Sequence, residues 1–197
     1  MTYAGLTSAV SKQEEYIHLG GNIIEGDPFT FCPLVWRYLI DRFAVRSVLD
    51  LGSGLGFAAR WFFNQGVATC AVDGLRENVR NAVYPTVLCD LTTDSVHTSV
   101  DLVHCQEVVE HIEEKYIDNL MKSLMCGRFA VITHALPDQG GYHHVNEKPI
   151  EYWVHQFTSR GYGVLIEDSN RIRRIAAQEG ARYMAASGLV FAAPSTR

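Results

Sequence analysis

The sequence is poor in positive charge: 17 of its 197 residues are lysine or arginine, against 22 aspartate or glutamate, giving a net charge of −5 at pH 7. This balance argues against a protein held on nucleic acid by bulk electrostatics, although a local basic patch is compatible with it. Apolar residues make up 47% and charged residues 20% of the chain, as in ordinary globular proteins. The composition therefore excludes disordered and collagen-like classes.

Cysteine pairs, a signal sequence and membrane-length apolar runs are also missing. The five cysteines include no Cys-x-x-Cys pair, which argues against a zinc site built on thiolates. The opening "MTYAGLTSAVSKQEEY" lacks the basic start and apolar run of a secretory signal, and no apolar stretch is long enough to span a bilayer. Cysteines within apolar runs, such as Cys70 and Cys105, are typical of a reducing compartment. We therefore expect a cytoplasmic protein without a membrane partner.

What the chain does have is an alternation of short apolar runs with amphipathic stretches. We expect a single domain over residues 1–197, with an N-terminal lid or helical segment at 1–45 and a core at 46–197. Strands of this kind alternating with helices indicate a Rossmann-like, doubly wound α/β/α sandwich, whose seven-stranded, mostly parallel sheet carries helices on both faces. The predicted strands are 46–51, 67–73, 86–91, 100–105, 128–135, 162–168 and 187–193, and the predicted helices include 57–66, 107–125 and 149–161.

The stretch "VLDLGSGLGF", residues 48–57, joins the first strand to a glycine turn. A dinucleotide-binding Gly-x-Gly-x-x-Gly turn that starts at Gly52 needs its third glycine where this chain has Phe57. A phosphate-binding loop is excluded as well, because no Gly-Lys-Ser/Thr follows. The pattern is instead Asp-x-Gly-x-Gly-x-Gly, from Asp50 to Gly56.

This pattern resembles the first motif of the class I S-adenosylmethionine-dependent methyltransferases, and the resemblance covers residues 46–135. It implies that Asp50 accepts from the cofactor ammonium or orders the loop, that Asp73 binds both ribose hydroxyls, and that Asp90 accepts from the adenine amino group. Any one of these aspartates alone would be ordinary turn chemistry, but all three follow successive strands. The implied cofactor is S-adenosyl-L-methionine, bound by Asp50, Gly52, Ser53, Gly54, Gly56, Asp73, Gly74, Asp90, Leu91 and Gln106.

The segment "QEVVEHI", residues 106–112, carries a Glu-x-x-Glu-His motif that many of these enzymes share. On a helix, Glu107, Glu110 and His111 would share one face, opposite the apolar stripe around Val108, and would look into the cleft. They then form a candidate ligand set for a divalent metal, Mg²⁺ or Mn²⁺. In similar enzymes that methylate the terminal 2′-hydroxyl of small RNAs, a downstream histidine completes the set. The alternative is that Glu107 positions the cofactor while the other two cap the helix.

The loop "ALPDQGGYHHVNEKP", residues 135–149, is long and polar, and we expect it to lie over the transferred methyl group and set substrate choice. A histidine near its reference pKa can accept a hydroxyl proton as the methyl group is transferred. His143 and His144 are therefore the first candidate bases, followed by His134, and any of the three can supply the extra metal ligand. Glu107 is a further candidate catalytic residue. At least one of the paired histidines is expected only to pack or to be exposed.

Two other groups of residues are open to two interpretations. Phe29, Phe31 and Trp36 would line the pocket as part of an N-terminal lid, or Trp36 would only anchor its helix to the sheet. The segment "RIRR", residues 171–174, and Arg182 would meet an anionic group on the substrate, or lie exposed on a solvated helix.

Three functions fit these observations. The leading hypothesis is methyl transfer from S-adenosylmethionine to a hydroxyl of a small molecule or sugar, because the chain is short and acidic. The first alternative is an RNA 3′-end 2′-O-methyltransferase that uses a divalent metal; nucleic acid is otherwise not the expected partner. The second is a non-catalytic binding subunit that keeps the cofactor fold. The acceptor and the oligomeric state do not follow from the sequence.

Overall fold

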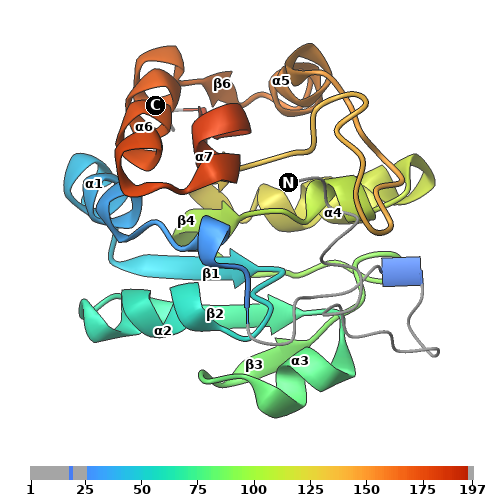
Figure 1. The fold of residues 1–197 in the computed structure, drawn as a ribbon, viewed down its shortest axis with the longest axis horizontal. Coiled ribbons are helices and arrows are strands. Elements are labelled where there is room, and N and C mark those ends of the chain that lie inside the picture. The colour runs from blue at the N-terminus through green and yellow to red at the C-terminus, as the bar shows by residue number, and fades with distance from the viewer. Residues whose placement is uncertain (1–17, 20–25, 195–197) are drawn as a thin grey trace.

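The computed structural model describes residues 18–19 and 26–194, so most of the predicted N-terminal lid lies outside the described residues. One seven-stranded sheet forms the centre of the molecule, with helices on both sides (Figure 1). This confirms the predicted α/β fold. The strands are β1 (Ser47–Leu51), β2 (Ala68–Asp73), β3 (Thr86–Leu88), β4 (Val100–Cys105), β5 (Gly127–Ile132), β6 (Gly163–Val164) and β7 (Leu189–Ala192); the helices are α1 (Pro33–Phe43), α2 (Phe57–Asn64), α3 (Arg76–Asn81), α4 (Ile117–Leu124), α5 (Ile150–Thr158), α6 (Ile166–Glu179) and α7 (Arg182–Ser187).

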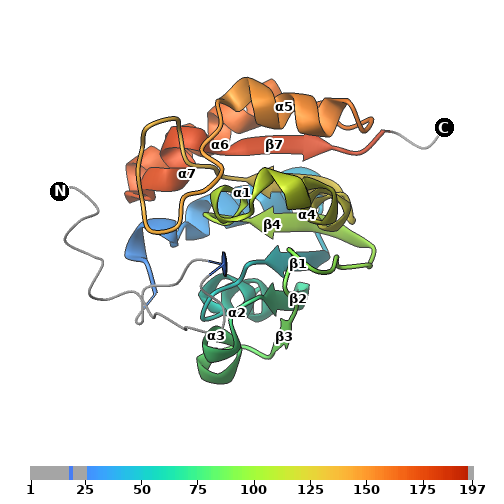
Figure 2. The same cartoon turned by 90° about the vertical axis from the view of Figure 1, so that its right-hand side faces the viewer.

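The strand order is β3-β2-β1-β4-β5-β7-β6, and Figures 1 and 2 show the strands stacked from β3 at the bottom upward. Strands β1 to β5 are parallel to one another, whereas β7 runs antiparallel to both β5 and β6. The chain winds outward from β1 to β3 and then returns to β4 on the other side of β1. In a parallel sheet, ligands bind in the crevice at the carboxyl ends of the strands where the winding reverses, here β1 and β4.

Alternate residues of the central strands belong to two separate cores. Val48 and Leu102 pack on the side covered by α1 and α6, whereas Leu49 and Val103 pack on the side covered by α4 and α5. All four side chains are 0% exposed. The strands are therefore buried on both faces, which explains why they are nearly continuous apolar runs in the sequence.

The predicted helix over 107–125 is wrong in its first half. Glu107 has a φ of +56°, a left-handed conformation that interrupts a helix at that point. The chain then forms two 3-10 turns, η4 (Val109–His111) and η5 (Glu114–Tyr116), before α4 begins. The prediction that Glu107, Glu110 and His111 share one helix face is therefore wrong as well.

The predicted strand over 162–168 is present but much shorter than expected. Only Gly163 and Val164 pair with β7, and α6 begins at Ile166. The arginines of 171–174 consequently lie on this long helix, as one of their two sequence interpretations required. Within the described residues, every helix falls short of the length and apolar character needed to cross a membrane.

Candidate functional site

A cavity of about 620 Å³ opens where β1, β2 and β4 end. The glycine turn, the segment after β4 and the residues preceding α1 form its walls, and the loop from β5 to α5 contributes from the side toward which the arrows of β1 and β2 point (Figure 1). Of the predicted cofactor residues, the cavity is lined by Asp50, Gly52, Ser53, Gly54, Asp73, Gly74, Leu91 and Gln106. Gly56 and Asp90 are not among the lining residues.

The glycine turn brings backbone against the cavity where side chains would not fit. Gly52 has a φ of +72°, and a Cβ atom there would lie 2.3 Å from Cγ2 of Val108. Two residues later, the backbone N–H of Gly54 donates to Oδ2 of Asp73 over 2.8 Å. The turn thus ties the end of β1 to the end of β2.

Asp50 is held by a buried chain of hydrogen bonds. His104 Nδ1 lies 2.7 Å from Asp50 Oδ1, and Trp36 Nε1 donates to His104 Nε2 over 3.1 Å. The three residues are at most 3% exposed. The two predicted roles of Trp36 therefore occur together, because it both lines the cavity and anchors α1 to the sheet.

Three buried polar atoms of lining residues have no hydrogen-bond partner in the described part of the chain: Asp50 Oδ2, Ser53 Oγ and Gln106 Nε2. Buried polar atoms are nearly always paired, so such a set indicates a ligand or water. One carboxylate oxygen suits an ammonium group, while a hydroxyl and an amide N–H suit a carboxylate. The atoms fit the amino-acid end of S-adenosylmethionine.

Asp73 and Asp90 make more hydrogen bonds within the protein than the sequence suggests. Asp73 accepts from the backbone N–H groups of Gly54 and Leu75 and from Asn78 Nδ2, and burial raises its pKa to about 6. Asp90 accepts from Thr92 and lies 2.8 Å from His18 Nε2. Asp73 lines the cavity and retains acceptor capacity for a ribose, whereas the adenine role of Asp90 stays a prediction.

The two glutamates after β4 lie in different environments. Glu107 lines the cavity, its backbone N–H donates to Thr133 Oγ1, and the Thr133 hydroxyl donates back to its carboxylate over 2.8 Å. Glu110 is 0% exposed, no donor of the described residues bonds its carboxylate oxygens, and its carboxyl group interacts with that of Glu107. Burial raises the pKa of both groups, and the charge of Glu107 raises that of Glu110 further.

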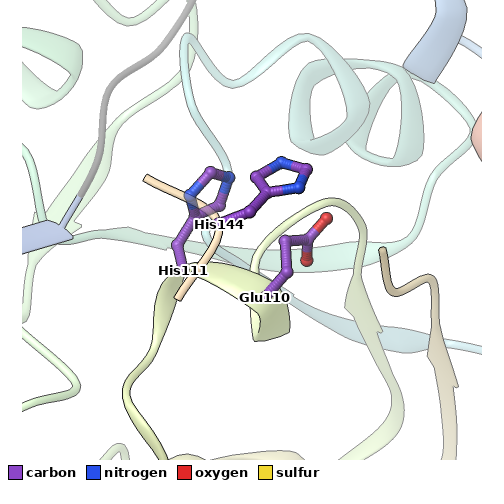
Figure 3. A group of neighbouring side chains, drawn as sticks. All are labelled: Glu110, His111 and His144. Atoms are coloured by element: carbon purple, nitrogen blue, oxygen red, sulfur yellow. The ribbon is translucent and has the colours of Figure 1, made fainter. Parts of the chain in front are cut away.

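Glu110, His111 and His144 form a group whose ligand atoms all lie within 4.8 Å of one another (Figure 3). It contains two of the three predicted metal ligands and adds His144 in place of Glu107. His111 Nδ1 donates to the carbonyl of His143 over 3.1 Å, and burial lowers the pKa of His111 to about 4. This imidazole is therefore neutral, and its Nε2 carries the lone pair that a metal or proton needs.

The three candidate histidine bases differ in whether they line the cavity. His144 lines the cavity, and its Nδ1 lies 3.0 Å from Oε1 of Glu147. His143 does not line the cavity and contacts the carbonyl of His18. His134 is 1% exposed, contacts the carbonyl of Ala135 and lies outside the lining set.

Several lining residues escaped the sequence interpretation. Asp27, Tyr142, Glu179 and His104 all border the cavity. His104 is the next-to-last residue of the mostly apolar strand β4, and the sequence pattern gives no sign of its polar partners. Phe31 lines the cavity as predicted. Arg182 stacks over Phe29, 4.1 Å from the ring centroid.

Comparisons with known proteins bear on the family and the fold. Residues 49–126 match the family model of a methyltransferase domain. The methyltransferase domain of bacterial CtHen1-C has 15% identity and a TM-score of 0.59, covering 85% of this chain and 98% of that one. A TehB-like SAM-dependent methyltransferase from Corynebacterium glutamicum has 21% identity and a TM-score of 0.53, covering 66% and 73%. The [4+2]-cyclase SpnF has 12% identity and a TM-score of 0.56, covering 83% and 82%. No curated protein sequence matches the chain.

At these identities the solved structures establish the fold alone, and the presence of a cyclase among them shows that this fold is not restricted to methyl transfer. The activity comes from the family match, which covers the glycine turn, β2, β4 and the Glu-x-x-Glu-His segment. The match over residues 49–126 and the fold together support an enzyme of the class I S-adenosylmethionine-dependent methyltransferase type.

Proposed function

We propose that this enzyme transfers the methyl group of S-adenosylmethionine to a hydroxyl of a small molecule or sugar. The observation that carries the proposal is the set of three buried atoms of lining residues without a partner among the described residues, Asp50 Oδ2, Ser53 Oγ and Gln106 Nε2. The bound cofactor would supply an electrophilic methyl on a sulfonium. The chain's own residues would hold its amino-acid end, and Asp73 would hold its ribose.

The remaining walls suit an uncharged, hydroxyl-rich acceptor. Asp27, Glu107 and Glu179 line the cavity beyond the cofactor residues, and no lysine or arginine lies among the described lining residues. Acidic walls disfavour a phosphorylated or carboxylated acceptor, whereas carboxylates readily accept hydrogen bonds from sugar hydroxyls. A small neutral polyol therefore fits better than an anion.

His144 is the proposed base. It lines the cavity, and its Nδ1 lies 3.0 Å from Oε1 of Glu147, which orients the imidazole ring. Methyl transfer from a sulfonium is an in-line displacement, so aligning the acceptor oxygen with the methyl supplies much of the acceleration, and removal of the hydroxyl proton supplies the rest.

The proposal is tested by screening sugars and hydroxylated small molecules with methyl-labelled cofactor, in the presence of EDTA and without it. We expect label transfer to a neutral hydroxyl compound that survives the chelator. A chain that binds S-adenosylhomocysteine but labels only amines or anionic acceptors would contradict the proposed acceptor class. The predicted cytoplasmic location stays a proposal, supported by the five free cysteines.

A second candidate is an RNA 3′-end 2′-O-methyltransferase that uses Mg²⁺ or Mn²⁺. The group of Glu110, His111 and His144 favours it, because a buried carboxylate and a neutral imidazole are suitable ligands. Here His144 would be a ligand and not the base, and the metal would supply Lewis-acid polarisation of the acceptor hydroxyl. Methylation of RNA ends that EDTA abolishes and Mn²⁺ restores would select this candidate.

A further inference from the structure

The hydrogen bonds from Trp36 through His104 to Asp50 have only one consistent arrangement of protons. An indole N–H can only donate, so His104 Nε2 must accept from Trp36. In the neutral imidazole the proton then lies on Nδ1, which donates to Asp50 Oδ1 over 2.7 Å. Asp50 thereby has one oxygen fixed, while its Oδ2 is buried without a partner among the described residues.

The fold places these three side chains together and prevents them from turning away. Asp50 and His104 are register partners on the adjacent parallel strands β1 and β4, so their side chains lie next to each other on the same face of the sheet. The Trp36 ring packs against Phe62 and Trp61 with centroid separations of 5.6 and 5.3 Å. An indole packed on several sides keeps its N–H directed at His104.

We infer that His104 and Trp36 are positioning residues for the amino-acid end of the cofactor, which they serve by fixing the orientation of the Asp50 carboxylate. His104 occupies Oδ1, which leaves Oδ2 as the atom that accepts from the cofactor ammonium. The inference rests on the proposed cofactor site. Both residues also line the cavity, but the role assigned here acts through Asp50.

A matched pair of ligands separates this role from a purely structural one. S-adenosylhomocysteine carries the ammonium group, whereas 5′-methylthioadenosine has the same nucleoside and thioether without the amino-acid end. In titration calorimetry, His104→Leu is expected to weaken S-adenosylhomocysteine binding by about tenfold to a hundredfold, the value of one charge-assisted hydrogen bond. Binding of 5′-methylthioadenosine is expected to be unchanged.

Two conservative variants provide the controls. His104→Asn places an amide N–H near the former position of Nδ1, so it is expected to restore most of the lost affinity. Trp36→Phe keeps an aromatic ring but removes the donor to His104, so it is expected to weaken S-adenosylhomocysteine selectively and by less than His104→Leu. These two variants keep the test decisive even where His104→Leu fails to fold.

Equal losses for the two ligands, or no loss for either, would overturn the positioning role and leave His104 as a core residue. Failure of the unmodified chain to bind S-adenosylhomocysteine would instead overturn the proposed cofactor site itself. The two failures are therefore distinguishable in one set of titrations.

Discussion

His144 Nδ1 lies 3.0 Å from Glu147 Oε1, within a loop that brings His144 to the cavity wall. The side chain of His144 is 4% exposed and that of Glu147 18%, so the pair is shielded from bulk water. A carboxylate only accepts, so the imidazole Nδ1–H donates to it and the ring is held in one tautomer. A carboxylate that orients a histidine in this way is a common arrangement for proton transfer.

Replacing His144 should remove proton transfer without removing the cofactor site. His144→Ala is expected to lower the rate of methyl transfer by about 10²- to 10⁴-fold, the usual contribution of a general base, while the affinity for S-adenosylhomocysteine stays unchanged. Single-turnover transfer of labelled methyl and calorimetry measure the two quantities. His155→Ala, at an exposed position on α5, is the control and should leave both unchanged. Full activity in His144→Ala would exclude it as the base.

Gly141 should be needed for the position of His144. A Cβ atom at Gly141 would lie 2.3 Å from His144 Nε2, closer than atoms approach one another. Gly141→Ala is therefore expected to displace the imidazole and reduce methyl transfer at least tenfold, because small misplacements of a reacting group are costly. Gly163→Ala meets no atom within 4 Å and has an ordinary backbone conformation, so it should be nearly silent. Equal activities of the two variants would show that the loop adapts without loss.

The sequence was sufficient for the central sheet because β1 and β4 are buried on both faces, and continuous apolar runs are their direct signature. It failed after β4, where the periodicity of Val109, Ile112 and later residues suggested one helix. The left-handed backbone of Glu107, pinned by the Thr133 hydroxyl, ends that regularity. Such a constraint comes from a residue distant in the chain and leaves no trace in a local pattern.

The sequence predicted the candidate site only in part. Asp50 and the glycine turn follow from the motif, and all but Gly56 line the cavity. His104 was not predictable, because a histidine within an apolar strand gives no sign of its partner on the adjacent strand. Nor was it predictable that His144 lines the cavity and His143 does not, since the left-handed φ of +56° at His143 has no signature in the local sequence.

The steric effect of Val108 on a side chain at position 52 can be measured separately from the strain of the left-handed backbone there. Gly52 has a φ of +72° and Gly66 one of +80°, but a Cβ at Gly66 meets nothing within 4 Å. Gly66→Ala should therefore cost only the left-handed strain, about 1–2 kcal/mol. Gly52→Ala should cost about 1–3 kcal/mol more from overpacking and should abolish S-adenosylhomocysteine binding. Urea unfolding measures both free energies, and equal costs would mean that Val108 simply moves aside.

Asp101 should stabilise the start of the sheet in a pH-dependent way. Its Oδ2 accepts from the backbone N–H groups of Arg46 and Ser47, and its Oδ1 accepts from Arg128 over 2.9 Å. Burial acts to raise the pKa of this carboxyl, but the hydrogen bonds from Arg46, Arg128 and Ser47 outweigh it, and the net pKa lies below the ordinary value of 3.8. The ionised carboxylate is thus favoured in the folded state.

A carboxyl whose pKa is lowered by folding contributes stability above its unfolded pKa and loses that contribution as the pH falls through the folded pKa. Asp101→Asn is therefore expected to lower the free energy of unfolding at pH 7 by about 1 kcal/mol, the scale of partly screened hydrogen bonds to a charge. Urea unfolding from pH 7 down to about pH 3 should show the difference shrinking as the native carboxyl is protonated. Asp118→Asn is the control, because that side chain is 77% exposed and accepts from the Arg160 guanidinium on the surface. A deficit that stays constant with pH would mean that Asp101 acts through shape and not through its charge.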